Sequence, residues 1–257
     1  MRRLVLLIGI AFGLGSSGPT IARSSAPILV ELFTSEGCSS CPPADSLLQQ
    51  LIETSPVAGT EVIGLGEHVD YWDRLGWRDR FSSADFSERQ QRYASALKVP
   101  SPYTPQMIVD GRSEFVGSDV KAARLAIERA AVLPRGVVAI AAEPSPTNHV
   151  AVAVKATELP ALSRGDHADI MLAIIQNGLQ SNVRAGENKG RALTHAAVVR
   201  RLSTIGEAKG DAKAVRAEVK LEPDWQRDHV RLVAFVQERA SRHVLAAAVA
   251  PLLGARP

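Results

Sequence analysis

Hydrophobic and polar positions follow two different patterns along this chain, and the change falls near residue 135. Ile28 to Phe33 is an apolar run interrupted only by Glu31, which predicts a strand buried on both faces. Apolar residues after it recur at helical spacing, and Pro42 and Pro43 suit the first turn of such a helix because that turn needs no intrahelical N–H donor.

The rest of the first half continues this alternation of strands and helices. Its order is predicted as strand, helix, strand, helix, strand, strand, helix, with Asp110-Gly111 as a hairpin turn between the last two strands. The elements after the first helix are expected at Glu61 to Gly66, Ser83 to Leu97, Gln106 to Val109, Arg112 to Val116 and Asp119 to Val132.

After Pro134 short strands with turn signals replace the helices, which predicts a β-sandwich-like domain. Gly186 to His195 interrupts them as a glycine-bounded loop. The predicted strands are Val137 to Ala142, His149 to Ala156, Asp169 to Gln176, Ala197 to Leu202, Ala214 to Leu221, Val230 to Val236 and Val244 to Val249. We therefore expect an α/β domain over residues 25–135 and an all-β domain over 136–257.

The N-terminus has the pattern of a secretory signal peptide over residues 1–24. Met1-Arg2-Arg3 is followed by an apolar stretch from Leu4 to about Gly15 and then by small residues. The apolar stretch is short for a membrane span, although a retained N-terminal anchor is the alternative. A periplasmic or secreted location is expected, and such compartments are oxidising.

Charge adds little to this picture. The formal net charge of the 257 residues is +3, and the basic residues are scattered rather than gathered in a dense stripe. This distribution gives little support to nucleic-acid binding.

Cys38 and Cys41 are the only cysteines, and they form a Cys-x-x-Cys pair at the predicted start of the first helix. The N-terminus of a helix stabilises a thiolate, and two thiols at this spacing can close and reopen a disulfide. Redox activity is the first hypothesis. The alternative is a structural staple or an incidental pair, although so short a loop constrains little chain entropy.

The element order over residues 27–133, with Cys-x-x-Cys after the first strand, resembles the thioredoxin superfamily. The resemblance implies a thioredoxin-like domain followed by the β-sandwich-like domain. It also implies that Cys38 is the more exposed, attacking thiol and that Cys41 resolves the mixed disulfide. Its partners would be exported proteins with thiols or disulfides and a redox partner protein. No cofactor and no metal is required.

The same resemblance assigns Thr104-Pro105, just before a predicted strand, to the cis-proline segment that offers its backbone to a substrate peptide. Pro100 and Pro102 compete for that place, and an ordinary proline-rich turn is the alternative. Gln106 follows where thioredoxins usually have Thr, so partner preference stays open.

Glu31 matches the buried acid of thioredoxins if one residue is inserted before Cys38. A buried carboxylate would suit proton transfer, and a solvated edge position is the alternative. Trp72 belongs to an insert, His68 to Asp79, that follows the second predicted strand. Since strand ends converge on one edge, this insert is expected either to form a functional rim above the disulfide or to pack as a surface loop.

A closer likeness is to a family of secreted bacterial proteins of unknown function. Its signatures resemble three segments here: Thr34-Ser35-Glu36-Gly37-Cys38-Ser39-Ser40-Cys41-Pro42-Pro43-Ala44-Asp45, His68-Val69-Asp70-Tyr71-Trp72, and Gly186-Glu187-Asn188 through His195. This likeness implies export and a shared fold, but no particular activity.

Thiol–disulfide exchange with exported proteins is the expected function. The rival is a binding protein, either a copper carrier using Cys38, Cys41 and His68 or an adaptor with an idle disulfide. The loop from Gly186 to His195 is interpreted as a contact surface toward the first domain or a partner, or else as simple turn chemistry.

Overall fold

The computed structural model describes residues 26–208 and 212–252. The predicted signal peptide, residues 1–24, lies outside this range. Among the residues described, no helix has the length and apolar character needed to cross a membrane.

The first half contains four strands, three α-helices and a short 3-10 helix. In chain order they are β1 (Ala26–Thr34), α1 (Pro42–Thr54), β2 (Thr60–His68), η1 (Asp73–Leu75), α2 (Ala84–Leu97), β3 (Gln106–Val109), β4 (Ser113–Val116) and α3 (Val120–Ala131). The predicted order of strands and α-helices in this half is confirmed.

The described part of the second half is built of strands and one short 3-10 helix. They are β5 (Val137–Ser145), β6 (His149–Thr157), β7 (Ala168–Gln176), β8 (Leu179–Asn182), β9 (Ala192–His195), β10 (Val198–Ala208), β11 (Ala212–Lys220), η2 (Arg227–His229), β12 (Val230–Glu238) and β13 (Val244–Pro251). The segment predicted as a loop to His195 thus ends in a strand, β9, which pairs with β8.

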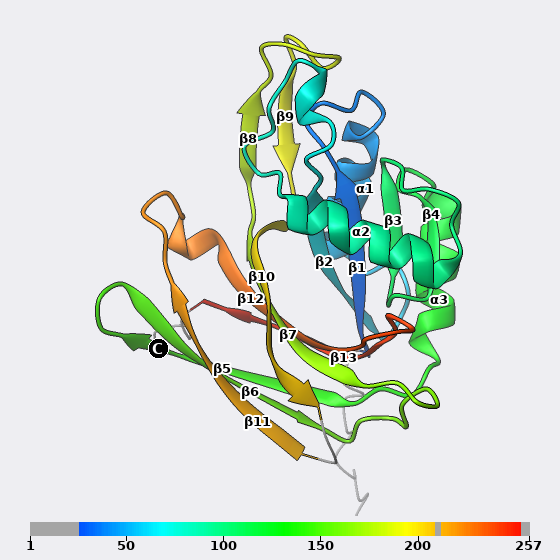
Figure 1. Cartoon of the computed structure of the whole chain (residues 1–257), viewed down its shortest axis with the longest axis vertical. Coiled ribbons are helices and arrows are strands. Elements are labelled where there is room, and N and C mark those ends of the chain that lie inside the picture. Colours follow the sequence, from blue (N-terminus) through cyan, green and yellow to red (C-terminus); the bar gives the residue numbers. More distant parts are fainter. Residues whose placement is uncertain (1–25, 209–211, 253–257) are drawn as a thin grey trace, which may run out of the picture.

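The predicted fold class is wrong. Strands of both halves form one mixed eight-stranded sheet in the order β13-β12-β7-β10-β2-β1-β3-β4 (Figure 1). The molecule is mostly β-sheet, and it does not divide into an α/β thioredoxin-like domain followed by a β-sandwich. The local hydrophobic pattern could not reveal this, because it reports which face of a strand is buried but not which distant strand pairs with its edge.

The contact between the two halves of the sheet is the pairing of β2 with β10, where Val198 aligns with Gly66. The Gly66 N–H donates to the Ala197 carbonyl at 2.8 Å. A β-carbon at Gly66 would lie 2.8 Å from the Ala196 carbonyl oxygen, so a side chain there would push β10 away. Glycine is therefore required for this close approach of two backbones.

Strand β1 is buried on both faces, as its sequence predicts. It pairs in parallel with β2 and antiparallel with β3. Ile28, Val30 and Leu32 pack with residues of α1 and α3 on one face of the sheet. Leu29 and Phe33 belong to the clusters on the other face, where α2 lies.

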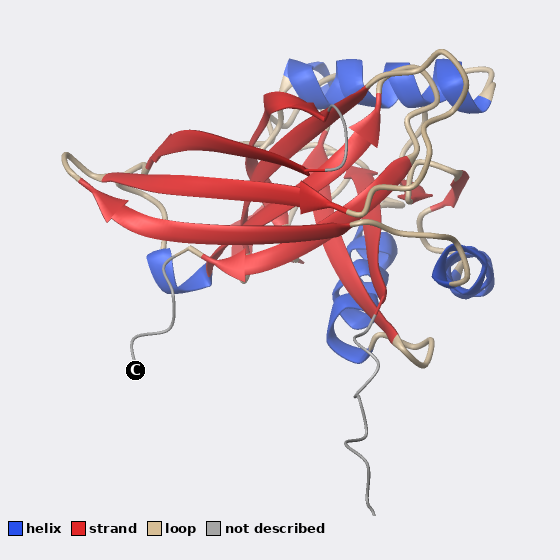
Figure 2. Cartoon of the chain, turned by 90° about the horizontal axis from the view of Figure 1, so that it is seen from below, coloured by secondary structure: helices blue, strands red, loops and turns tan. Residues whose placement is uncertain are grey.

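The three-stranded sheet β11-β6-β5 covers one face of the large sheet at the end that contains β7 and β12 (Figure 2). Alternate residues of β6, among them Val152, pack against alternate residues of β7 and β12, such as Leu172 and Ala234. The opposite face of β7, including Ala173 and Ile175, turns toward the α2 side. The strand periodicity predicted for this half is therefore present, but its strands belong to two different sheets.

The contact at Gly66 leads to a stability prediction. Gly66→Ala should lower the free energy of unfolding by about 2 kcal/mol or more, since the new methyl group meets backbone that cannot rotate away. Gly206→Ala on β10 is the matched control, because its β-carbon would meet only the Val215 side chain. Urea unfolding of wild type and both variants checks this, and an unfolding midpoint of Gly66→Ala equal to that of wild type would show that β10 can shift freely from β2.

Candidate functional site

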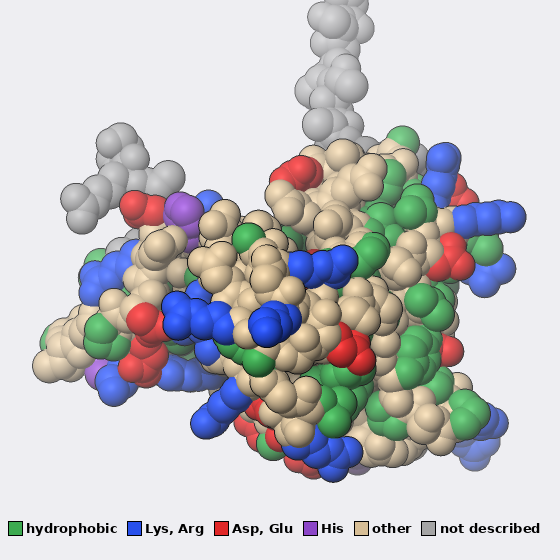
Figure 3. Space-filling model, turned by 90° about the horizontal axis from the view of Figure 1, so that it is seen from above, with side chains coloured by type: hydrophobic (Ala, Val, Ile, Leu, Met, Phe, Trp, Pro, Cys, Tyr) green, Lys and Arg blue, Asp and Glu red, His purple; other side chains and the backbone are tan. Residues whose placement is uncertain are grey.

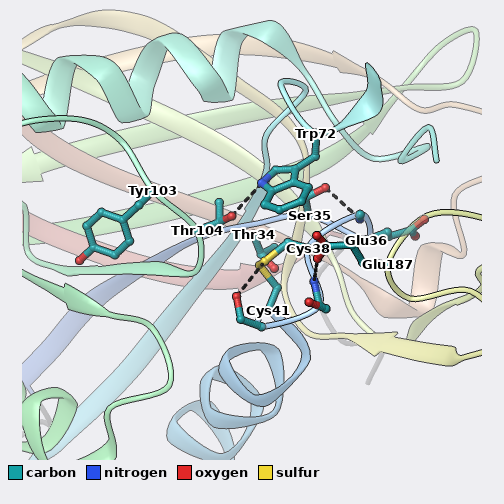
Figure 4. Close-up of a disulfide and its surroundings, with 12 residues drawn as sticks. Thr34, Ser35, Glu36, Cys38, Cys41, Trp72, Tyr103, Thr104 and Glu187 are labelled. Carbon is teal, nitrogen blue, oxygen red and sulfur yellow. Dashed lines mark hydrogen bonds between the residues drawn. A yellow bond between two sulfur atoms is a disulfide. The ribbon is translucent and has the colours of Figure 1, made fainter. Parts of the chain in front are cut away.

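Cys38 and Cys41 lie in the turn between β1 and α1 and are joined by a disulfide, with 5.4 Å between their Cα atoms (Figure 4). Cys41 is the residue directly before α1, and Pro42 and Pro43 occupy its first positions. The Cys41 carbonyl accepts hydrogen bonds from the N–H groups of Ala44 and Asp45 at 2.8 and 3.1 Å. The predicted placement of the pair at a helix start is confirmed.

Both cysteines are fully buried, each with 0% of its surface exposed. The sequence-based expectation that Cys38 is the more exposed thiol is therefore wrong for this disulfide form. Trp72 packs beside Gly37, where a β-carbon on that glycine would lie 3.3 Å from the Trp72 β-carbon. Part of the cover over the disulfide thus comes from the insert after β2.

A second cover comes from residues 184–191 between β8 and β9, called here the 184–191 loop. The buried Asn188 side chain donates to the carbonyls of Glu36 and Cys38, each at 2.9 Å. The Glu187 carboxylate accepts from the Ser39 N–H at 3.0 Å. The loop is therefore bonded directly to the Cys-x-x-Cys turn, and Asn188 does more than cap a local turn.

A buried cluster of ionisable side chains lies next to this turn. His195 of β9 lies between two acids, with its Nε2 3.5 Å from Glu36 and its Nδ1 3.7 Å from Asp45. Asp45 also accepts from the Thr34 hydroxyl at 3.2 Å. Each of these side chains is less than a tenth exposed.

A second histidine extends the cluster. His68, at the end of β2, has its ring 4.8 Å from that of His195 and its Nδ1 2.6 Å from an Asp79 carboxylate oxygen. Asp79 also accepts from the Glu36 N–H at 2.9 Å, and the Trp77 indole donates to Glu36 at 2.7 Å. The insert after β2 is thereby tied to the segment that precedes Cys38.

The environment of this cluster shifts three of its pKa values. Burial alone would lower the pKa of His195, but Asp45 and Glu36 outweigh it and raise that pKa to about 9. Burial disfavours the Asp79 carboxylate, yet His68 and the backbone donors lower the pKa of Asp79 to about 2. The pKa of Glu36 is also lowered, since His195 and other donors outweigh burial and the nearby Asp79 charge. His195 is thus a buried cation at neutral pH.

The structure brings together most of the residues that the sequence singled out. The Trp72 indole donates to the Thr104 hydroxyl at 2.8 Å, and both lie beside the disulfide (Figure 4). The Thr104-Pro105 peptide bond is cis. Pro105 is buried near Leu32 and Ala44, because all three would contact a β-carbon placed at Gly117.

Glu31 is the predicted site residue that does not lie beside the disulfide. Its neighbours Val30 and Leu32 face α1, so the alternation of the strand directs Glu31 to the opposite face. There it accepts hydrogen bonds from Arg89 of α2, at 2.7 Å from Nε, and from the Tyr93 hydroxyl. Glu31 is buried, as one of the two sequence interpretations proposed, but it lies on the face away from the helix that the cysteines open.

Possible metal ligands do not converge in the same way. Across residues 26–208 and 212–252, no group of three or more His, Cys, Asp and Glu side chains has an arrangement that could hold a metal ion. His68, the histidine considered as a copper ligand, is directed at Asp79 and His195.

Sequence reasoning gave no individual role to four members of the site, Glu36, Asp45, Asp79 and His195, and it named Asn188 only as part of a possible contact surface toward the first domain. All four stand within or beside the quoted sequence segments, so proximity to those segments was the available signal. Their convergence depends on the pairing of β8 with β9 and on the β2–β10 contact.

Seen from above, Lys and Arg side chains are separated by neutral and acidic ones (Figure 3).

Comparison with known proteins identifies the family. A family model described as "Protein of unknown function (DUF1223)" matches residues 29–237, so the chain belongs to that family. A crystal structure of a protein from Agrobacterium tumefaciens is similar, with 29% identity over 91% of this chain and 96% of that chain and a TM-score of 0.64. HBP35 of Porphyromonas gingivalis shares the fold, with 16% identity over 91% of this chain and 78% of that chain and a TM-score of 0.65. No curated protein matches this chain.

The ion pairs of His195 lead to a pH-dependent prediction. Because its pKa is raised from 6.5 to about 9, the stabilisation is complete below about pH 6.5 and is lost as pH rises through 9. His195→Asn should therefore destabilise the protein by on the order of 2–3 kcal/mol at pH 6, and the difference from wild type should shrink by pH 9.5.

Urea unfolding between pH 6 and 9.5 measures this difference. His167→Asn is the control, since the His167 side chain is 66% exposed and exposed pairs contribute little. A difference that stays constant across this pH range would contradict a buried His195 cation.

The 184–191 loop leads to a prediction about access to the disulfide. Asn188→Ala removes two of the three hydrogen bonds between the loop and the segment around the cysteines and leaves that of Glu187, so reduction of Cys38–Cys41 by dithiothreitol should accelerate about three- to tenfold. Lys189→Ala changes an exposed side chain of the same loop and serves as the control. Equal reduction rates for both variants and wild type would show that the loop does not limit access.

Proposed function

We propose that this member of the DUF1223 family is an exported thiol–disulfide oxidoreductase that acts on protein disulfides. The observation that carries the proposal is the Cys38–Cys41 disulfide placed directly before α1 at the end of a buried strand. Catalytic cysteines favour helix N-termini, where the local field stabilises a thiolate. Export is proposed from the charged, apolar and small-residue pattern of residues 1–24.

The exchange conserves atoms and electrons. A substrate thiolate attacks the Cys38 sulfur, the Cys38–Cys41 bond breaks, and Cys41 leaves as a thiolate that takes up a proton. A second substrate thiol, deprotonated as it attacks, then displaces Cys38. The substrate becomes a disulfide and the protein a dithiol. In reverse, the Cys38 thiolate attacks a substrate disulfide and Cys41 resolves the intermediate.

Disulfide exchange in this geometry requires that a substrate thiolate reach the sulfur atoms of Cys38–Cys41. An attacking thiolate must approach the buried disulfide, so the 184–191 loop or Trp72 has to move first. Displacing Asn188 costs two hydrogen bonds to backbone carbonyls, which a substrate backbone could replace. Protein substrates that supply such donors are therefore favoured over small disulfides.

The segment Thr104-Pro105 and Trp72 are proposed as the substrate contact. They lie beside the disulfide and are joined by the Trp72–Thr104 hydrogen bond. The likeness to the thioredoxin superfamily is proposed for this local arrangement alone, and not for the fold. The alternation of side chains along β1 places Glu31 on the opposite face of the sheet, away from the disulfide and the substrate contact. Its pairing with Arg89 there supports a structural role.

A second function is favoured by a different observation. Complete burial of both cysteines under the 184–191 loop is also what an adaptor with an idle disulfide would show. A cell-envelope copper carrier is the other form of this alternative. Its reduced thiols would bind Cu(I) and retain it, while an oxidoreductase would turn over disulfides without bound metal.

Trapping experiments test the oxidoreductase directly. Cys41→Ser should accumulate mixed disulfides with protein substrates, because the resolving thiol is gone, and Cys38→Ser should accumulate far fewer. In the reduced wild-type protein, Cys38 should be alkylated well before Cys41. Equal, slow alkylation of both thiols and no trapped species would contradict the proposed function and favour the adaptor.

A further inference from the structure

A cleft of about 490 Å³ lies between the N-terminal half of α2 and strand β10, on the α2 side of the sheet. Its lining is rich in arginine and contains two acidic residues, Asp85 and Asp169. The arginines are Arg80, Arg89, Arg92, Arg200, Arg201 and Arg242. None of these residues belongs to the site around the cysteines.

A bulge in β10 supplies two of the arginines. Consecutive residues of a regular strand point to opposite faces, so Arg200 and Arg201 would ordinarily be separated by the sheet. The pairing of β10 with β7 shifts register between Val199 and Arg201. Both residues then line the cleft, and both guanidinium groups lie within 6 Å of the Trp225 ring. The Arg200 guanidinium is also close to Phe81 of the cleft, whereas the Arg201 guanidinium donates to Lys220 and Glu222, outside it. Bulges of this kind redirect side chains toward binding sites.

Arg242 is held at the cleft by an unusual backbone. Its φ is +66°, a left-handed conformation that non-glycine residues rarely adopt. The Arg242 carbonyl accepts from the Gln237 side chain at 2.8 Å, and the guanidinium lies 5.3 Å from the Tyr93 ring. One Nη of the guanidinium donates to the Gln237 side-chain oxygen at 2.8 Å, and its Nε is buried without a hydrogen-bond partner. Backbone strain of this kind concentrates at ligand-binding sites.

The positive groups of this cleft are close to one another. Burial and the neighbouring Arg89 and Arg92 charges lower the pKa of Arg242. Arg80 and Arg200 lie 4.5 and 5.6 Å from the centre of the same ring, that of Phe81. An anion bound among these guanidinium groups would relieve their mutual repulsion.

Arg89 is already paired with the buried Glu31, so the charge available to a ligand comes from the other arginines. The acids that pair with Arg200 and Arg201 do not close the cleft. Arg200 donates to Asp224 at 2.6 Å, but the Asp224 side chain is 67% exposed. Arg201 contacts Glu222 at 3.1 Å, and both side chains are about a third exposed. Asp169 is engaged with Arg239. Exposed pairs of this type are weak and can exchange for a ligand anion.

We propose that this cleft binds a small organic molecule with at least two acidic groups, phosphate or carboxylate. The guanidinium groups of Arg200 and Arg242 would each donate hydrogen bonds to one acidic group, planar or tetrahedral. The apolar lining from Phe81 and Phe86 would contact the carbon framework between the acidic groups. The proposal is independent of the redox function.

Calorimetric titration of the full chain with pyrophosphate and with citrate, at constant ionic strength, tests it. At least one probe should bind saturably with a dissociation constant below about 1 mM. Stronger binding of pyrophosphate indicates a phosphorylated ligand, and stronger binding of citrate a polycarboxylate.

Arg200→Gln and Arg242→Gln should each weaken binding about tenfold or more, as expected for loss of a charged hydrogen bond. Arg216→Gln on β11, outside the cleft and exposed, should bind like wild type. Arg200 is only partly buried, so its variant keeps the test valid if Arg242→Gln unfolds. Absence of saturable binding by wild type, or equal weakening by Arg216→Gln, would overturn the proposal.

Discussion

The close approach of β2 and β10 at Gly66 is the constraint on which the rest of this structure depends. The contact is a single aligned residue pair and a 2.8 Å backbone hydrogen bond, yet it joins the strands of both halves into one sheet. It fixes the start of β10 and, just before it, β9 with His195. The same strand carries Arg200 and Arg201, which line the arginine cleft. The cysteine site and the arginine cleft are therefore both positioned by this join.

Each face of the sheet around β1 buries its own set of charged side chains. On the α1 face, His195 lies between Glu36 and Asp45 close to the disulfide. On the α2 face, Arg89 is paired with Glu31 and lies 3.3 Å from the fully buried Glu67. Burial and the neighbouring Glu31 raise the pKa of Glu67 well above its usual value, although the Arg89 charge opposes them. Such buried pairs are costly to break, which makes the arrangement around them specific.

The sequence predicted the features that depend on neighbouring residues. The apolar run of β1, the placement of Cys38 and Cys41 before α1 and the change to strands after residue 135 follow from local periodicity. The single sheet did not follow, because strand pairing between β2 and β10 leaves no local pattern. For the same reason, the sequence could predict contact between the loop that contains Asn188 and the first half only as one of two alternatives, the other being simple turn chemistry.

Two misjudged residues illustrate this limit. The resemblance aligns Glu31 with a buried acid near the cysteines if one residue is inserted before Cys38, but the alternation of β1 directs Glu31 to the α2 face, where it meets Arg89. Cys38 was expected to be exposed, because the cover supplied by a loop 150 residues away is invisible to local analysis.

The central claim is that Cys38–Cys41 is an exchanging disulfide rather than a structural staple. Equilibrating the protein with glutathione buffers and measuring the fraction of reduced Cys38 tests it most directly. The account predicts a reduction potential between about −270 and −120 mV, the range of dithiol exchange proteins. A potential below about −300 mV, typical of structural disulfides, would contradict it.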